Sequence, residues 1–148
     1  MATVTPAKPV DLLLVEDNPG DIRLTQEALK EAPVPIHLSV AMDGVEAVDF
    51  LKRRGKFQHA PRPDLILLDL NLPLKNGPEV LSEIKSDPDL KRIPVLVMTT
   101  SRAPADVQQA YSLNANCYIS KPVRLDDFMN VVESIENFWL QTAVLPPE

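Results

Sequence analysis

The sequence has little glycine, few aromatic residues and one cysteine among its 148 residues. With four glycines, it has no glycine-rich Lys-Ser/Thr stretch of the P-loop type. The one cysteine, Cys117, cannot form a disulfide within the chain, which favours a reducing cytoplasm. No apolar run approaches the roughly 20 residues that cross a bilayer, and residues 1–9 lack the apolar core of a signal peptide. We therefore expect neither a membrane span nor secretion.

Charge and length limit the remaining classes. The formal net charge is -6 and no basic run marks a face for phosphate backbones, so a nucleic-acid partner is not expected. A chain of this length with 45% hydrophobic residues is suited to one domain with a proper core. We expect a flexible head over residues 1–9, a domain over 10–140, and a tail over 141–148 that is too short for an output domain.

Short apolar runs alternate with amphipathic segments along the chain. Such runs, when bounded by polar residues and prolines, are typical of parallel strands buried on both faces. Strands are expected at 10–15, 36–41, 93–98 and 117–120 and in the apolar run that ends at Asp69, and helices at 19–31, 45–51, 78–87, 105–113 and 125–140. This alternation predicts an α/β fold with a doubly wound, five-stranded parallel sheet.

The run from Pro63 to Pro73 is the central one, because Asp69 closes its strand. In an open α/β sheet, ligands bind outside the carboxyl ends of the strands. Asp69 is therefore a candidate nucleophile or metal ligand, although the run alone is equally compatible with a turn residue that ends a strand.

Polar residues at the other strand ends support the functional interpretation. They are Glu16 and Asp17 after the first strand, Asn71 beyond Asp69, Thr99 after the fourth strand and Lys121 after the fifth. Converging carboxylates repel one another unless a cation lies among them, and Mg²⁺ prefers oxygen ligands of this kind. With a metal bound, Asp69 could attack a phosphoryl group, while Lys121 and the Thr99 hydroxyl hold the phosphate oxygens.

These motifs resemble the receiver domain of two-component response regulators. The matching segments are Leu14 to Asn18, Leu67 to Pro73, Gly77, Pro94 with Met98-Thr99, and Lys121-Pro122. The resemblance implies a flavodoxin-like sheet in the order 2-1-3-4-5, with Asp69 as phosphoacceptor and Lys121 as phosphate ligand. It makes Glu16, Asp17, Asp69 and the backbone carbonyl of Asn71 the Mg²⁺ ligands, Thr99 and Tyr118 the switch residues, and the Lys121–Pro122 bond cis.

The chain departs from the usual receiver pattern at Thr100, which replaces a common alanine, and in the long connection from Lys52 to Arg62. With its ending Phe138-Trp139-Leu140, it resembles the stand-alone regulators of cyanobacterial phytochromes. This implies a phytochrome histidine kinase as phosphodonor and a homodimer. We expect Val132, Trp139 and Leu145 to form an exposed apolar dimer contact; alternatively, Trp139 folds back on its own domain.

Two other classes share parts of this pattern. A haloacid-dehalogenase-like phosphatase also uses a strand-end aspartate with Mg²⁺, but it usually has an acid two residues later, where this chain has Asn71. An amide cannot protonate a leaving group. A flavodoxin-like electron carrier would place a flavin phosphate after the first strand, where Glu16 and Asp17 would repel it. A signalling phosphoacceptor that is not an enzyme, with only slow self-dephosphorylation, is therefore the leading hypothesis.

Overall fold

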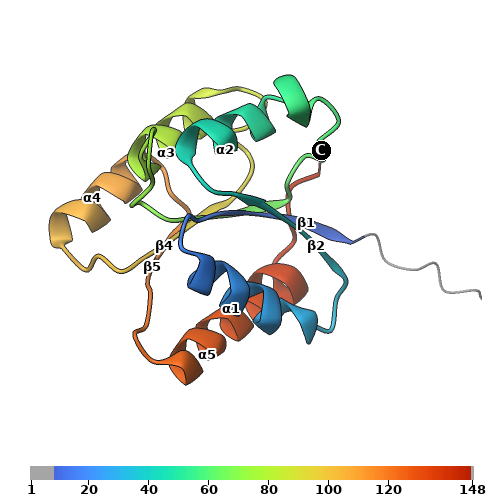
Figure 1. Ribbon diagram of the computed structural model, residues 1–148, viewed down its shortest axis with the longest axis vertical. Helices are drawn as coiled ribbons and strands as arrows, with labels where there is room; N and C mark the ends of the chain where they lie inside the picture. Colours follow the sequence, from blue (N-terminus) through green and yellow to red (C-terminus); the bar gives the residue numbers. More distant parts are fainter. Residues whose placement is uncertain (1–8, 148) are drawn as a thin grey trace, which may run out of the picture.

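The computed structural model describes residues 9–147 and contains one five-stranded sheet. All neighbouring strands are parallel, and their order is β2-β1-β3-β4-β5 (Figure 1). The strands are β1 (Val10–Val15), β2 (Ile36–Ala41), β3 (Leu65–Leu68), β4 (Val95–Thr99) and β5 (Cys117–Ser120). The predicted fold class and the implied strand order are both confirmed.

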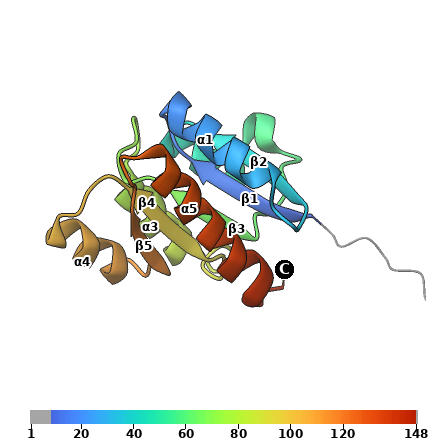
Figure 2. The ribbon, with the colours of Figure 1, turned by 90° about the horizontal axis from the view of Figure 1, so that it is seen from below.

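Two helical layers cover the sheet. The helices are α1 (Pro19–Lys30), α2 (Gly44–Leu51), α3 (Gly77–Ser86), α4 (Pro104–Ser112) and α5 (Leu125–Ile135). Helices α2, α3 and α4 lie on one side of the sheet and α1 and α5 on the other (Figure 1). Figure 2 shows α1 and α5 side by side.

Alternate residues of the buried strands supply two separate hydrophobic cores. In β1, Leu13 and Val15 face α2 and α3, whereas Leu12 and Leu14 pack with residues of α1 and α5. The strand β3 is divided in the same way, and all four of its residues are buried. This burial on both faces explains why the strands appear in the sequence as continuous apolar runs.

The last helix ends earlier than expected. The α-helix α5 stops at Ile135, and Glu136–Thr142 continue as a π-helical segment, so the prediction of a single helix to Leu140 is wrong at this point. A π-helical segment has the wider i→i+5 hydrogen bonding, which sequence periodicity does not distinguish from an α-helix. Within the connection from Lys52 to Arg62, Gly55–Phe57 form a short 3-10 turn.

The expectation that Val132 is exposed is also wrong. Its side chain is completely buried in the core beneath α1 and α5. Phe128, Val132 and Ile135 have the i, i+4, i+7 spacing of one buried helix face, so they share this core. Trp139 is half-buried against the same core, in agreement with the alternative that it folds back on its own domain.

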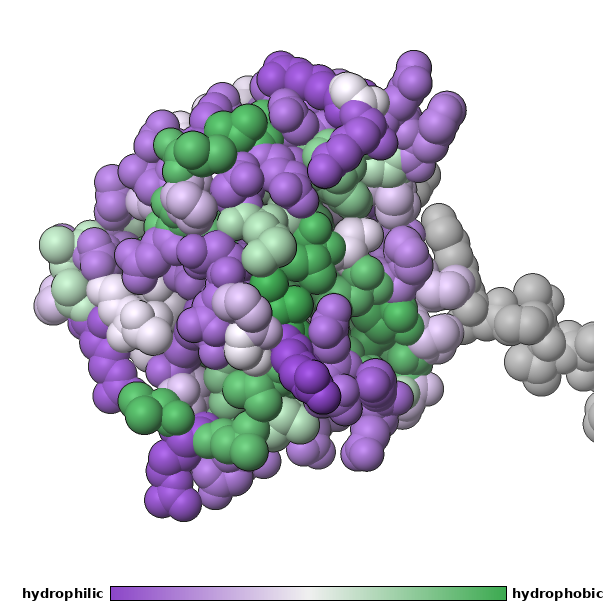
Figure 3. All heavy atoms as spheres, viewed as in Figure 1, coloured by the Kyte–Doolittle hydropathy of each residue, from purple (hydrophilic) through white to green (hydrophobic). Residues whose placement is uncertain are grey.

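The surface of the described residues has two further features. On the face in Figure 3, apolar atoms reach the surface over the edge strand β2, where Ile36, Leu38 and Val40 are half-buried. After the π-helical segment, Pro146 and Pro147 lie beside Pro63 at the start of β3.

Within residues 9–147, no helix has the length and apolar character needed to cross a membrane. Residues 1–8, which make up most of the expected head, are outside the described part.

Candidate functional site

The carboxyl ends of β1, β3, β4 and β5 bring the predicted polar residues to one edge of the sheet. The backbone ladder continues one residue past the strands: Glu16 N–H donates to Ala41 O at 2.9 Å, and Asp69 N–H donates to Val15 O at 3.0 Å. Lys121 N–H donates to Thr99 O at 2.6 Å. These bonds fix the backbone beneath each functional side chain, so the site is built on rigid elements.

The Lys121 ammonium is the centre of the site. Its Nζ donates to Glu16 Oε1 at 2.9 Å and to Asp69 Oδ2 at 2.9 Å. Glu16, Asp69 and Lys121 are 2%, 7% and 8% exposed. A buried charge is tolerated only when it is paired and hydrogen-bonded, and here each charge of the trio satisfies that condition. The structure thus brings together three of the residues predicted from the sequence.

Asp21 is a member of the site that the sequence interpretation missed. It lies in the first turn of α1, and its Oδ2 accepts a hydrogen bond from Lys121 Nζ at 2.9 Å. The only signal in the sequence was an acid in a first helical turn, which is common for its interaction with the helix dipole. The contact depends on how α1 crosses the sheet, which the local sequence does not determine.

Burial and hydrogen bonding move the pKa values of the two buried carboxylates in opposite directions. Burial, together with a hydrogen bond to Asp69, raises the pKa of Glu16 to about 8. Burial alone would raise the pKa of Asp69, but bonds with Glu16, Lys121 and the Asn71 N–H outweigh it and lower that pKa. For Lys121, the pairing with carboxylates outweighs burial and raises the pKa. The pKa values of the coupled pair are therefore driven apart, and Asp69 is the carboxylate that ionises more readily.

The acidic set fits a hard divalent cation. One carboxylate oxygen each from Glu16, Asp17 and Asp69 lies within 4.8 Å of the others, and Asp17 is exposed to solvent. With Asp21, four carboxylates stand against the one ammonium of Lys121. This excess of negative charge and the all-oxygen donor set are suited to Mg²⁺ or Mn²⁺.

The pocket around Asp69 is narrow, and apolar side chains make up most of its wall. Asp69 Oδ1 accepts a hydrogen bond from Asn71 N–H at 3.1 Å, which orients the carboxylate. A cavity of only about 10 Å³ lies between Asp69, Lys121 and Asp21, about the room of one water molecule. Thr99 Oγ1 is buried and has no hydrogen-bond partner within residues 9–147, so this donor is available to a new acceptor.

Tyr118 is tied to the loop after β4. Its hydroxyl donates to Ser101 O at 2.9 Å, and its backbone N–H donates to the Tyr111 hydroxyl at 3.1 Å. Tyr118 therefore links β5 to both the start and the far end of α4. Thr100, the residue that departs from the usual receiver pattern, is exposed.

The Lys121–Pro122 bond differs from its expected geometry. Residues 9–147 contain no cis peptide bond, so the expectation of a cis bond at this position is wrong. Trans is the intrinsically favoured isomer even before proline. The trans backbone already brings Lys121 Nζ to all three of its carboxylate partners.

Comparisons with known proteins agree with this geometry. A family model described as "Response regulator receiver domain" matches residues 12–133. Response regulator Rcp1 of Synechocystis is 51% identical over 138 residues, which cover 93% of this chain and 94% of that protein. The probable methanogenesis regulatory protein FilR2 of Methanothrix harundinacea is 39% identical over 133 residues, which cover 89% of this chain and 84% of that protein.

Solved structures extend the similarity to three dimensions. The Mn(2+)-bound form of Rcp1 superposes with a TM-score of 0.91, covering 94% of this chain and 100% of that one at 51% identity. The phosphorylated cyanobacterial phytochrome response regulator RcpA gives 0.92, covering 95% and 100% at 52% identity. These comparisons do not support the haloacid-dehalogenase-like alternative. Since the family model matches most of the chain and Rcp1 is 51% identical over nearly its whole length, the chain belongs to the response regulator receiver domain family.

Proposed function

We propose that the protein accepts a phosphoryl group on Asp69 from a sensor histidine kinase and signals through the resulting change of its surface. The observation that carries this proposal is the contact of Asp69 Oδ2 with Lys121 Nζ at 2.9 Å, beside the acids Glu16 and Asp17. A low pKa keeps the Asp69 carboxylate ionised, as a nucleophile requires.

In the transfer step, an Asp69 carboxylate oxygen forms a bond to phosphorus while the bond to the donor histidine nitrogen breaks. The product is an acyl phosphate and a neutral histidine. Lys121 and the unpaired Thr99 hydroxyl are placed to hold the phosphate oxygens. We propose that Mg²⁺ is held by Glu16, Asp17, Asp69 and the Asn71 carbonyl; when bound, it neutralises charge during transfer.

The switch that we propose uses Thr99 and Tyr118. A phosphate on Asp69 offers Thr99 Oγ1 the acceptor that it lacks, and movement of Thr99 draws the loop after β4 inward. Tyr118 holds this loop through the hydrogen bond from its hydroxyl to Ser101 O at 2.9 Å. The same movement breaks that bond, and the Tyr118 side chain rotates. The faces of α4 and β5 would then differ between the two states.

The partner that we propose is a phytochrome histidine kinase. Support comes from the similarity to RcpA, whose structure is described as that of a phosphorylated cyanobacterial phytochrome response regulator. A cytoplasmic location agrees with this partner, because a histidine kinase takes its phosphate from intracellular ATP. We also propose a homodimer through the C-terminal face, meaning the apolar side chains of Phe138, Trp139, Val144 and Leu145 that follow α5. In the signalling role that we propose, hydrolysis of the acyl phosphate acts only as a timer.

Phosphotransfer from an autophosphorylated cyanobacterial phytochrome tests this function. Wild-type protein should remove labelled phosphate from the kinase, whereas Asp69→Asn should not. Asp89→Asn, which removes an exposed acid from the connection before β4, is the matched control and should behave as wild type. Transfer to Asp69→Asn at the wild-type rate would refute the assignment of Asp69. If the wild-type protein accepts phosphate from another histidine kinase but not from phytochrome, only the proposed partner is refuted.

A further inference from the structure

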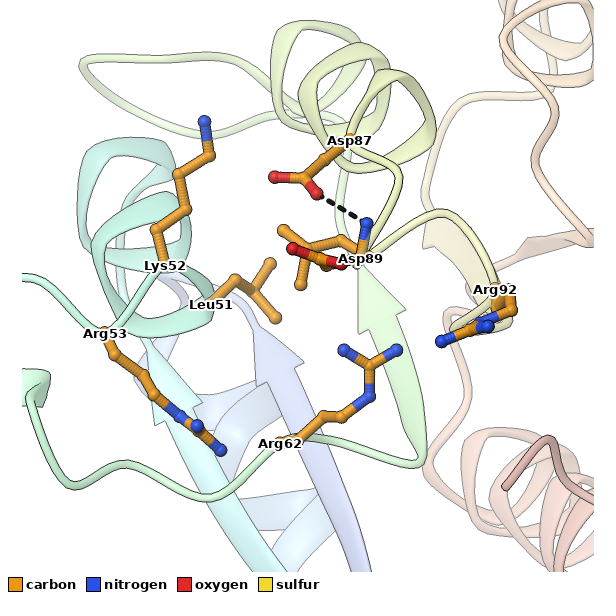
Figure 4. A pocket seen from close by; sticks show the side chains of 8 residues that line it. Leu51, Lys52, Arg53, Arg62, Asp87, Asp89 and Arg92 are labelled. Atoms are coloured by element: carbon orange, nitrogen blue, oxygen red, sulfur yellow. Dashed lines mark hydrogen bonds between the residues drawn. The ribbon is translucent and has the colours of Figure 1, made fainter. Parts of the chain in front are cut away.

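A second polar cavity lies at the opposite edge of the sheet from Asp69. It has a volume of about 470 Å³, within the range of small-ligand sites, and is formed where α2 and α3 end and where β3 and β4 begin (Figure 4). Its lining consists of Leu51, Lys52, Arg53, Arg62, Asp87, Asp89, Leu90 and Arg92. None of these residues contributes to the phosphorylation site.

Three guanidinium groups gather along one side of this cavity. Arg53, Arg62 and Arg92 come from three separate segments; in Figure 4 the side chains of Arg62 and Arg92 are directed toward the hollow, and that of Arg53 runs along its lower margin. Within residues 9–147, no carboxylate oxygen lies within 4.0 Å of a charged nitrogen of any of the three. Like charges at one site in a protein of net charge -6 form a local positive field, which a bound anion would relieve.

One of these arginines is held in place before any ligand binds, and a second is partly buried. Arg53 has a left-handed backbone with φ of 54°, and its Nε donates to Ala60 O at 3.0 Å, which leaves its terminal nitrogens free. Arg62 is half-buried between Pro61 and Pro63, whose rings restrict the backbone on both sides. Groups that are already ordered lose less entropy on binding than freely moving surface side chains.

The attraction between positive side chains and the carboxyl ends of helices does not account for all of the basic residues that line the cavity. Lys52 and Arg53 directly follow α2, where positive charge stabilises the helix dipole. Arg62 and Arg92, however, lie in the connections that precede β3 and β4, and neither residue belongs to the last turn of a helix. Their position is better explained by the cavity that they line.

The other side of the cavity has a different chemistry. Asp87 and Asp89 occupy it, and Asp87 Oδ1 accepts a hydrogen bond from Asp89 N–H at 2.8 Å, drawn as the dashed line in Figure 4. The buried residues Leu51 and Leu90 complete the lining. A ligand that fills this space therefore needs an anionic end for the guanidinium groups and hydrogen-bond donors for the carboxylates.

We propose that this cavity binds a small phosphate ester of a sugar or nucleoside. Three arginines are suited to the doubly charged, three-oxygen phosphoryl group, which they can contact in the bidentate manner. Vicinal sugar hydroxyls are neutral groups that can donate hydrogen bonds to the carboxylates of Asp87 and Asp89. The ligand therefore needs no positive charge of its own at this side. The site is separate from Asp69, so ligand binding there does not require phosphorylation.

Calorimetric titration of the full chain with AMP, ribose 5-phosphate, adenosine and inorganic phosphate tests the proposal. We expect saturable 1:1 binding of a phosphate ester, and binding weaker by about tenfold or more for adenosine and for inorganic phosphate, because each lacks one half of the ligand. Arg62→Gln should weaken the binding of the phosphate ester by about tenfold or more, since it removes a charge-assisted contact.

Two control variants separate this site from nonspecific charge and from the phosphorylation site. Arg23→Gln removes an exposed positive charge from α1 and should leave binding unchanged, and Asp69→Asn should also leave it unchanged. The proposal is overturned if neither ester binds at millimolar concentration, if Arg62→Gln and Arg23→Gln bind alike, or if inorganic phosphate binds as tightly as the esters.

Discussion

At the scale of single residues, the phosphorylation site is a problem of charge balance. The carboxylates of Glu16, Asp21 and Asp69 all accept hydrogen bonds from one ammonium, Lys121. Each bond uses one of the three ammonium protons, so Lys121 has no donor left for a phosphate unless a partner withdraws. Asp21 is the most exposed of the three acids, with 26% of its side chain accessible, so it is the partner that can be released at least cost.

Replacing Asp21 with asparagine should lower the free energy of unfolding by about 1 kcal/mol without divalent metal, because a partly buried ion pair is lost. Asp17→Asn is the matched control. Asp17 is exposed and makes no bond to Lys121, and its removal relieves repulsion within the acidic cluster. Urea unfolding in chelator should therefore show a loss for Asp21→Asn only; equal losses in both variants would contradict the assignment of Asp21.

The raised pKa of Glu16 predicts how metal-free stability depends on pH. A folded-state pKa of about 8, above the ordinary value of 4.5, stabilises the fold fully below pH 4.5, and this contribution is lost as pH rises through 8. Relative to Glu16→Gln, wild-type protein should therefore lose stability progressively as the pH rises across this window. Parallel stability curves for the two proteins, measured by urea unfolding in chelator, would show that Glu16 does not titrate there.

At the scale of elements, the connection from β3 to α3 positions Asp69. Gly77 N–H donates to Leu70 O at 3.0 Å, and a side chain at Gly77 would collide with the Asp69 carbonyl oxygen and the Leu70 Cα. Asn76 caps the helix with a capping box to Glu79. The start of α3 is therefore packed directly against the backbone that carries the phosphoacceptor.

Gly77→Ala should destabilise the protein by about 2 kcal/mol or more, because its methyl group meets backbone atoms that cannot move aside cheaply. Gly20→Ala in the first turn of α1 is the control, since its added methyl would approach only the Asn18 side chain. Thermal unfolding should therefore separate the two variants clearly. If both have the same small effect, the close approach at Gly77 has no energetic importance.

The sequence predicted this arrangement as far as local patterns reach. Apolar runs that end in acids placed Glu16, Asp17 and Asp69 on one edge, because parallel strands share the direction of their carboxyl ends. The helical spacing of Val132 with Phe128 and Ile135 also indicates that Val132 is buried with them. The Asp21–Lys121 contact and the arginine cavity were not predictable, since each depends on how segments far apart in the chain are oriented.

At the scale of the whole molecule, the two edges of the sheet have opposite character. Acids surround Asp69 at the carboxyl edge, whereas arginines line the cavity at the amino edge. The C-terminal face is apolar: Phe138 and Val144 are 55% and 96% exposed, and Phe138 packs edge to face on Trp139 at 5.5 Å between ring centres. Exposed apolar groups that lie together are typical of an interaction surface.

Phe138→Glu should convert the proposed homodimer to monomer without unfolding it, because this side chain is mostly exposed. Trp139→Glu should have the same effect on mass but also lower stability, since Trp139 is half-buried against the core. Light scattering gives the mass, and circular dichroism checks the fold. A native-like Phe138→Glu protein with the wild-type mass would exclude this face as the dimer contact.

The central claim is that Asp69 is a metal-dependent phosphoacceptor, and mass spectrometry after incubation with acetyl phosphate tests it most directly. The account predicts a single phosphoryl adduct that forms with Mg²⁺ but not in chelator, is removed by hydroxylamine as an acyl phosphate should be, and maps to Asp69. An adduct of the same yield without divalent metal, on another residue, or in the Asp69→Asn variant would contradict it.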